Sequence, residues 1–190
     1  GFKDVLIEKL GEDNVKFDEQ NAQGESATCA TIVNSFVSSN VDLILANATA
    51  PLQAAANATV DIPVLGTSVT DYATALAIED FKGTTGTNVS GTSDLAPIDE
   101  QAKMLVELFP KAKNVGLLYC SAEPNSKYQV DLIKKCLEKD KITCKEYSFV
   151  DSNDISAVVT KAVANSDVIY IPTDNTAASN TEVIDNIARQ

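Results

Sequence analysis

Apolar and polar residues alternate along the chain in two different periods. Short, nearly continuous apolar runs are typical of buried strands, and segments with apolar residues every three or four positions are typical of amphipathic helices. The runs predict strands over residues 41–46, 62–68, 114–120, 142–150 and 167–173, and we predict two further strands over the less apolar residues 15–22 and 88–92. The segments predict helices over residues 1–10, 26–40, 51–59, 72–78, 98–110, 126–140, 154–166 and 180–190. Strands that alternate with helices over short connections predict parallel sheets covered on both faces.

The composition changes in residues 82–97, KGTTGTNVSGTSDLAP, which contain three glycines and many threonines and serines. Such a composition is typical of a connector or hinge. We therefore divide the chain into an N-terminal lobe, residues 1–92, and a C-terminal lobe, residues 93–190. The predicted fold class is α/β, with two doubly wound parallel-sheet lobes joined by a hinge.

Composition narrows the classes of function. Hydrophobic residues make up 44% of the 190 residues, so a sizeable core can form. The net charge of -12 disfavours nucleic acid as a partner, because phosphate backbones would be repelled. The chain has no histidine, which excludes histidine-based triads and most zinc sites. We expect no metal and no catalytic residue.

Four cysteines occur, and none belongs to a C-x-x-C pair, so the common metal and redox motifs are absent. We interpret them as small buried hydrophobic residues. A disulfide between Cys136 and Cys144 is the alternative. No apolar run is long enough to cross a membrane, and residues 1–14 are typical of an amphipathic helix rather than a signal sequence.

Polar side chains follow four of the predicted strands at the point where each strand ends. They are Asn47 and Thr49; Thr67, Ser68, Thr70 and Asp71; Ser121, Glu123, Asn125 and Ser126; and Thr173, Asp174, Asn175 and Thr176. Helix capping explains any one of these clusters, because such side chains satisfy free backbone N–H groups. In parallel sheets, however, strand ends share the edge at which ligands bind. Four clusters in succession, two in each lobe, favour a ligand site.

A zwitterion such as an amino acid suits these side chains. Hydroxyls and the N–H groups of helix N-termini would hold its carboxylate. The carboxylate of Asp71 or Asp174 would hold its ammonium group by a charge-assisted hydrogen bond.

Several motifs together carry a resemblance to a known family. They are ANATAPLQAAANAT, TSVTDY, NVSGTSDLAPIDEQ, NVGLLYCSAEPNS and VIYIPTDNT, which extend over most of the chain. In this order and at these spacings the chain resembles the extracytoplasmic substrate-binding proteins of ABC importers. Within them it is most similar to the group linked to tryptophan or tyrosine uptake.

The resemblance implies a type I periplasmic-binding fold that clamps a small ligand, without a cofactor, between two lobes. It implies a membrane permease as partner and an extracytoplasmic location, periplasmic or lipid-anchored. By position, the ligand-binding residues would be Thr49, Thr70, Asp71, Asn125, Ser126, Thr173, Asp174 and Asn175. For an aromatic ligand, Tyr72, Tyr119 and Tyr128 are candidates to line a slot, although packing explains each of them equally well.

The chain departs from the pattern of this group at both ends. The group has a central strand before its first helix, whereas this chain starts at the helix. The chain also stops at Gln190, where further strands would return through the hinge. We expect the sequence to be part of a longer chain, without its signal region, whose remainder adds ligand contacts.

Three alternatives remain at this stage. An enzyme is disfavoured, because no G-x-S-x-G, P-loop or G-x-G-x-x-G motif follows any strand. A ligand-sensing domain of a transcriptional regulator or a receptor would have the same fold and cleft. A pure interaction module fits the acidic surface but leaves the polar strand ends with no role beyond capping.

Overall fold

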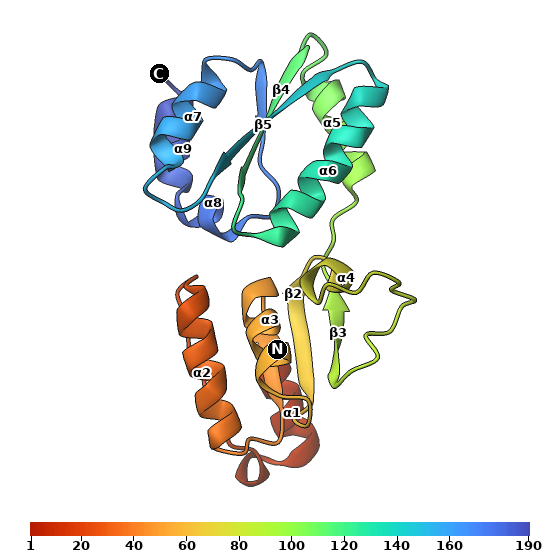
Figure 1. The fold of residues 1–190 in the computed structure, drawn as a ribbon, viewed down its shortest axis with the longest axis vertical. Coiled ribbons are helices and arrows are strands. Elements are labelled where there is room, and N and C mark those ends of the chain that lie inside the picture. Colours follow the sequence, from red (N-terminus) through yellow and green to blue (C-terminus); the bar gives the residue numbers. More distant parts are fainter.

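The computed structural model describes residues 1–190 as two lobes joined by one connection, residues 94–97 (Figure 1). The elements of the first lobe are α1 (Phe2–Leu10), the 3-10 helix η1 (Glu12–Asn14), α2 (Ser26–Ser38), β1 (Ile44–Asn47), α3 (Thr49–Ala58), β2 (Val64–Val69), α4 (Tyr72–Ala75) and β3 (Val89–Ser93). Those of the second lobe are α5 (Ile98–Leu108), β4 (Asn114–Cys120), α6 (Pro124–Lys139), β5 (Thr143–Phe149), α7 (Ile155–Val163), β6 (Val168–Tyr170), α8 (Asn175–Ser179) and α9 (Thr181–Ala188).

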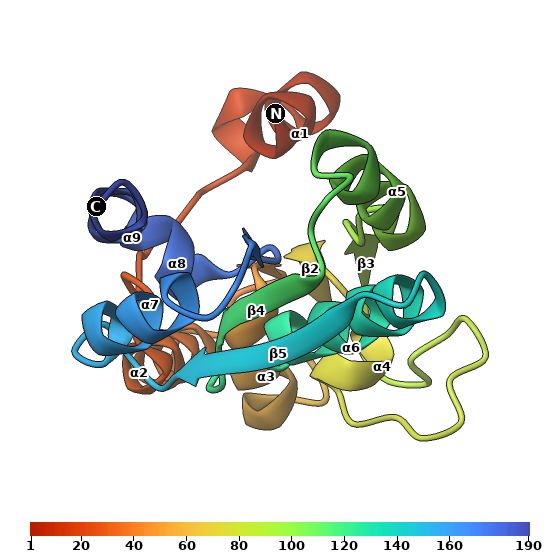
Figure 2. The same cartoon turned by 90° about the horizontal axis from the view of Figure 1, so that it is seen from above.

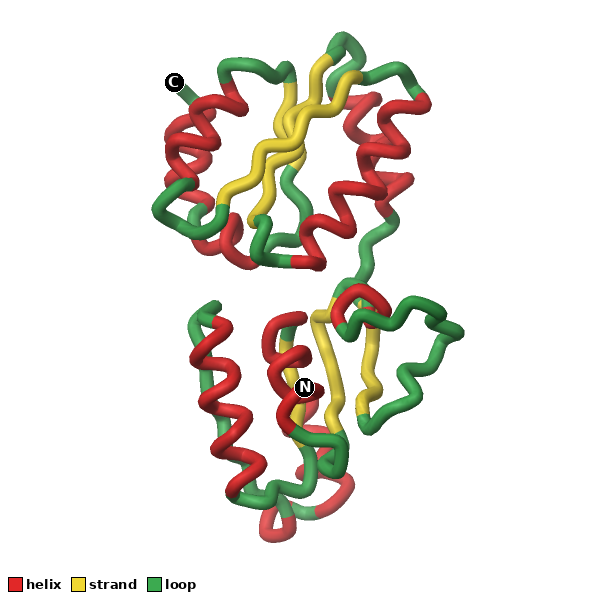
Figure 3. Tube along the Cα trace, in the orientation of Figure 1, coloured by secondary structure: helices red, strands yellow, loops and turns green.

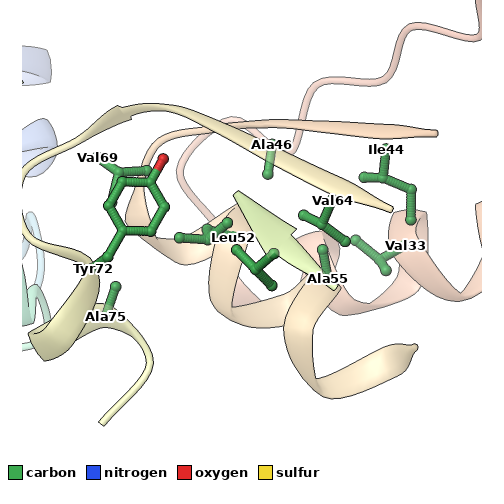
Figure 4. Packing of buried hydrophobic residues seen from close by; sticks show 10 residues of the cluster. Val33, Ile44, Ala46, Leu52, Ala55, Val64, Val69, Tyr72 and Ala75 are labelled. Atoms are coloured by element: carbon green, nitrogen blue, oxygen red, sulfur yellow. The ribbon is translucent and has the colours of Figure 1, made fainter. Parts of the chain in front are cut away.

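The first lobe has a parallel three-stranded sheet in the order β1-β2-β3. Ile44 pairs with Val64, and Val64 pairs in turn with Val89. The core lies on the face covered by α2, α3 and α4, where apolar side chains from helices and strands interlock (Figure 4). Leu45 on the opposite face is exposed. Between α4 and β3 a long loop, residues 76–88, extends away from the lobe (Figure 3).

Tyr72 fits the first lobe because two neighbouring strands carry glycine beside its ring. The hydroxyl of Tyr72 donates a hydrogen bond to the carbonyl oxygen of Thr92 at 3.3 Å. A Cβ at Gly91, whose φ is 154°, would lie 2.1 Å from the Tyr72 hydroxyl and 2.2 Å from the Gly66 carbonyl oxygen. Only glycine fits where the two strands and the ring meet.

The second lobe has a parallel sheet in the order β5-β4-β6, with helices on both faces (Figure 2). Successive side chains of β4 point to opposite faces. Leu117 packs with α5 and α6 in one buried cluster, and Leu118 packs with α7, α8 and α9 in the other. The predicted doubly wound arrangement is therefore confirmed for this lobe.

The predicted strand at residues 15–22 is wrong, because this segment forms no regular structure. A strand needs a neighbour to pair its backbone N–H and C=O groups, and neither sheet of the chain includes a pairing partner for this segment. It is held instead by Lys3, which pairs with Glu19 and lies over the ring of Phe17. The other predicted elements exist, with ends shifted by a few residues.

The interpretation of the four cysteines as buried hydrophobic residues is confirmed for two of them, and all four are free. Cys29 and Cys120 are buried, and Cys136 and Cys144 are half-buried. None of the helices is both long enough and apolar enough to traverse a lipid bilayer.

Candidate functional site

A cleft of about 1120 Å³ lies between the two lobes. Its walls come from α2, β1 and the start of α3 in the first lobe, and from the ends of β4 and β5 and from α8 in the second. The strands of both sheets point their carboxyl ends toward the other lobe, so the polar strand ends predicted from the sequence face one another (Figure 1).

Thr49 is the central residue of the first-lobe wall. It begins α3 directly after Ala48, which adopts a φ of 93° at the turn out of β1. The side chain of Thr49 is only 4% exposed, yet its hydroxyl makes no hydrogen bond within the protein. The N–H groups of Thr49 and Ala50 stand in the first turn of α3 and have no acceptor within the helix. This wall therefore presents unpaired donors to the cleft.

Glu123 organises the second-lobe wall. One oxygen of its carboxylate accepts hydrogen bonds from the backbone N–H of Asn175 at 2.9 Å and from its Nδ2 at 2.8 Å. The other oxygen accepts from the backbone N–H of Thr176 at 2.9 Å and from its hydroxyl at 2.8 Å. Burial alone would raise the pKa of Glu123, but these hydrogen bonds hold the pKa below its ordinary value.

Asp174 lies beneath this wall, with 3% of its surface exposed. Its Oδ1 accepts a hydrogen bond from the N–H of Ala177 at 2.8 Å and caps α8, while its Oδ2 accepts from the N–H of Cys120 at 2.7 Å. Burial raises the pKa of Asp174, although these hydrogen bonds and the neighbouring Ser126 hydroxyl oppose the shift. Both oxygens of Asp174 thus serve to tie β4 to α8.

Gln129 is a buried polar residue that the sequence predictions omit. Its Nε2 donates to the carbonyl oxygen of Thr173 at 3.2 Å, and its Oε1 accepts from the N–H of Thr173 at 3.2 Å. Asn125 donates from Nδ2 to the same carbonyl oxygen at 3.2 Å. The signal in the sequence is a polar residue next to Val130 and Ile133 on the apolar side of a helix. These bonds position the loop that follows β6.

Thr70 and Asp71 lie on the side of the hinge connection. The carbonyl oxygen of Thr70 accepts a hydrogen bond from the hydroxyl of Ser93 at 2.7 Å. Asp71 caps α4 by accepting from the N–H of Thr74 at 2.7 Å through Oδ1 only. Helix α4 contacts α6 of the second lobe, which contains Tyr128. Burial raises the pKa of Tyr128, and the negative charge of Asp71 raises it further. Asp71 and Tyr128 therefore lie on the two sides of this contact between the lobes.

The structure separates the eight predicted site residues into three groups. Thr49, Asn125 and Asn175 line the cleft. Ser126, Thr173 and Asp174 belong to the supporting layer of the second lobe, and Thr70 and Asp71 lie at the hinge side. Glu123 and Ser68, which ended predicted strands but were not assigned to the site, also line the cleft.

Two of the three tyrosines proposed for an aromatic slot have packing roles elsewhere. Tyr72 belongs to the core of the first lobe, and the Tyr119 hydroxyl donates to Glu146 at 3.0 Å. Tyr128 belongs to α6, the helix of the second lobe that contacts α4 of the first. No group of three or more Cys, Asp or Glu side chains is arranged to hold a metal ion.

Comparison with known proteins gives consistent matches over nearly the whole chain. A family model described as "ABC transporter substrate binding protein" matches residues 1–190. Over 178 residues the chain is 39% identical to a protein of Clostridioides difficile named "Tyrosine-binding protein". The matched region covers 94% of this chain and 51% of that protein. It therefore spans about half the length of this curated relative.

Two solved structures differ in how well their overall shape matches. One is an ABC domain from Streptococcus pneumoniae in complex with L-Trp, which is 34% identical over 97% of this chain and 63% of its own, with a TM-score of 0.90. The other is a ligand-free, open substrate-binding protein with adhesive properties from Clostridium difficile. It is 38% identical over 98% of this chain and 64% of its own, but its TM-score is only 0.62. The overall shape of the present chain is thus more similar to that of the ligand-bound structure.

Proposed function

The chain belongs to the family of ABC transporter substrate-binding proteins, and we propose that it holds one amino acid, aromatic in its side chain, between its two lobes. The observation that carries the proposal is the hydroxyl of Thr49, which has no partner within the protein and belongs to a residue only 4% exposed, at the N-terminus of α3 on the wall of the interlobe cleft. Relatives named for tyrosine and solved with L-Trp support an aromatic amino acid as the ligand. A binding role without catalysis agrees with the description of the family.

The first lobe supplies groups for both ends of a zwitterion. The ligand's carboxylate would accept hydrogen bonds from the Thr49 hydroxyl and from the first N–H groups of α3, where the helix dipole also favours an anion. Its ammonium group would bind Asp71, because one oxygen of Asp71 remains unpaired whereas both oxygens of Asp174 are used. Asp71 follows β2, the strand paired with β1, so both groups come from neighbouring strand ends.

The second lobe completes the site. Asn125 and Asn175 line the cleft and would contact the ligand directly, and the ring of Tyr128 would pack against its side chain. Ser126, Thr173 and Asp174 would act by holding these residues in place, and Thr70 by supporting the hinge side. Ligand contacts from both lobes would favour the closed arrangement, because only that arrangement makes them all.

A membrane permease would be the protein partner, and it would distinguish the closed, loaded form from the open form. The protein would act outside the cytoplasm, in the periplasm or anchored by lipid at the cell surface. Family membership supports both statements.

Isothermal titration calorimetry with L-tyrosine, L-tryptophan and L-leucine tests the proposal. We expect saturable binding of one ligand per protein, tighter for the aromatic ligands. Asp71→Asn should weaken binding by about tenfold or more, since it removes a charge-assisted hydrogen bond. Asp61→Asn, on an exposed turn away from the cleft, is the matched control. Absence of binding by all three, with an unchanged melting temperature, would contradict the proposal.

A further inference from the structure

The walls of the cleft carry negative charges and no positive ones. Glu19 and Glu25 line it from the first lobe, and Glu123 and Asp151 from the second. None of the 15 lysines and arginines of the chain lines it. A ligand that enters the cleft therefore meets a negative potential from both sides.

Most of this charge has no cationic partner. Glu19 is paired with Lys3, but no salt bridge involves Glu25, Glu123 or Asp151. Lys127, near the start of α6 and four residues after Glu123, is paired with Asp131 and Glu146. Three carboxylates thus act on the cleft without a compensating cation.

Apart from these carboxylates, the unpaired side-chain groups that the buried wall residues offer are neutral. The Thr49 hydroxyl and the Asn125 side-chain oxygen each belong to a residue at least nine-tenths buried, and neither atom has a partner within the protein. The Thr49 end of α3 provides donors for one carboxylate, that of the amino acid backbone. A second carboxylate on the ligand would lose its hydration with no cation to replace it.

From this distribution of charge we propose that the cleft discriminates by ligand charge: it admits amino acids with a neutral or cationic side chain and rejects those with an acidic one. The inference rests on the proposed function and adds to it a rule of specificity. Rejection here works through repulsion from the walls rather than through the shape of a pocket. It should therefore weaken when the wall charges are removed or screened.

Isosteric pairs separate charge from size. The probes are 4-carbamoyl-L-phenylalanine with 4-carboxy-L-phenylalanine, and L-glutamine with L-glutamate, each titrated by competition against L-tyrosine. We expect the carboxylate member of each pair to bind at least tenfold more weakly than the amide member. Equal affinity of the two members, or equal rejection of both, would overturn the proposal, because size and not charge would then decide.

Two exposed wall residues provide the matched variants. Glu25→Gln and Asp151→Asn keep the shape of the walls, and neither residue is placed in the ligand-binding machinery. In the double variant, the difference in affinity between the amide and the carboxylate member of a pair should shrink by about threefold or more. Added salt should reduce the same difference in the unaltered protein. Glu79→Gln with Asp80→Asn, exposed and outside the cleft, should leave the difference unchanged.

The result also separates this proposal from the proposed function. If L-tyrosine and L-tryptophan do not bind, the proposed function fails. If they bind, and the affinity difference within each pair is unchanged in the double variant, the proposed function stands and the proposed discrimination by ligand charge is wrong.

Discussion

The carboxylate of Glu123 accepts two hydrogen bonds from Thr176, one from its backbone N–H at 2.9 Å and one from its hydroxyl at 2.8 Å. Its other oxygen is bonded in the same way by Asn175. One side chain from the connection between β4 and α6 thus satisfies the first N–H groups of α8. Both segments line the cleft, so the shape of this wall depends on the ionised carboxylate of Glu123.

Glu123→Gln should destabilise the protein by about 1–3 kcal/mol, because an amide has one acceptor oxygen and its NH2 group would face the N–H donors of α8. Ligand affinity should fall as well, since Asn175 loses its support. Urea denaturation and calorimetry measure the two effects. Glu182→Gln on exposed α9 is the control and should change neither.

The contribution of Glu123 should depend on pH. Its pKa in the folded protein lies below the ordinary value, so its stabilising effect is fully present above the pKa of the unfolded chain. The effect should disappear as the pH falls from about 4.3, the ordinary pKa of glutamate, through the lower folded-state pKa. The difference in unfolding free energy between wild type and Glu123→Gln should therefore shrink over that range. A difference that grows with acidity would contradict the assignment.

Asp174→Asn should lower stability by about 2 kcal/mol, because one of its two backbone partners, Ala177 or Cys120, would face an NH2 group instead of an oxygen. Asp174→Ala removes both bonds and should lower it further. Thermal denaturation gives both values. Since neither oxygen of Asp174 is free, Asp174→Asn should weaken ligand binding less than Asp71→Asn does. The reverse order would identify Asp174 as the ammonium ligand.

The strands that pack on both faces are the elements best predicted from the sequence. Residues 114–120 are expected and observed as a strand with the same ends, because β4 lies between two others and its continuous apolar run has no other stable placement. Residues 15–22, VKFDEQNA, contain only three apolar residues and have no strand to pair with. The local sequence pattern indicates that a segment can form a strand. Whether it pairs in a sheet depends on a second strand from another part of the chain.

The site was predicted in part for a similar reason. Strand ends indicate the edge of the sheet, and three of the residues predicted there, Thr49, Asn125 and Asn175, line the cleft. The sequence could not show that the second oxygen of Asp174 is occupied by the N–H of Cys120, because that contact joins residues 54 positions apart and follows only from the fold.

Thr49→Val should weaken ligand binding by about 1–2 kcal/mol, roughly fivefold to thirtyfold, because the methyl group replaces the hydroxyl proposed to hold the ligand's carboxylate. The hydroxyl has no partner within the protein, so the melting temperature should not fall. Thr160→Val on α7, whose exposed hydroxyl donates to Ser156, is the control and should leave affinity unchanged. Unaltered affinity in Thr49→Val would remove Thr49 from the site.

Gly91→Ala should destabilise the first lobe by about 3 kcal/mol or more, since its Cβ would meet the backbone oxygen of Gly66 at 2.2 Å and the Tyr72 hydroxyl at 2.1 Å. Ser90→Ala, an exposed neighbour in β3, should change stability by less than about 0.5 kcal/mol. Circular dichroism during urea denaturation compares them. A combined Gly91→Ala and Tyr72→Phe variant should recover only part of the loss, because the contact with Gly66 remains.

Cys144 provides a chemical test of how the second lobe is packed. Burial raises the pKa of its thiol to about 11, so almost none of it is ionised near pH 8. Only the thiolate reacts with iodoacetamide, and the rate should therefore rise about tenfold per pH unit and level off only near pH 11. The same cysteine in urea should react at least tenfold faster at pH 8, because an ordinary thiol has a pKa of about 8.5. Peptide mass spectrometry follows each site separately. A rate in the folded protein that levels off near pH 8.5 would show that strand β5 leaves Cys144 open to solvent, against the packing described here.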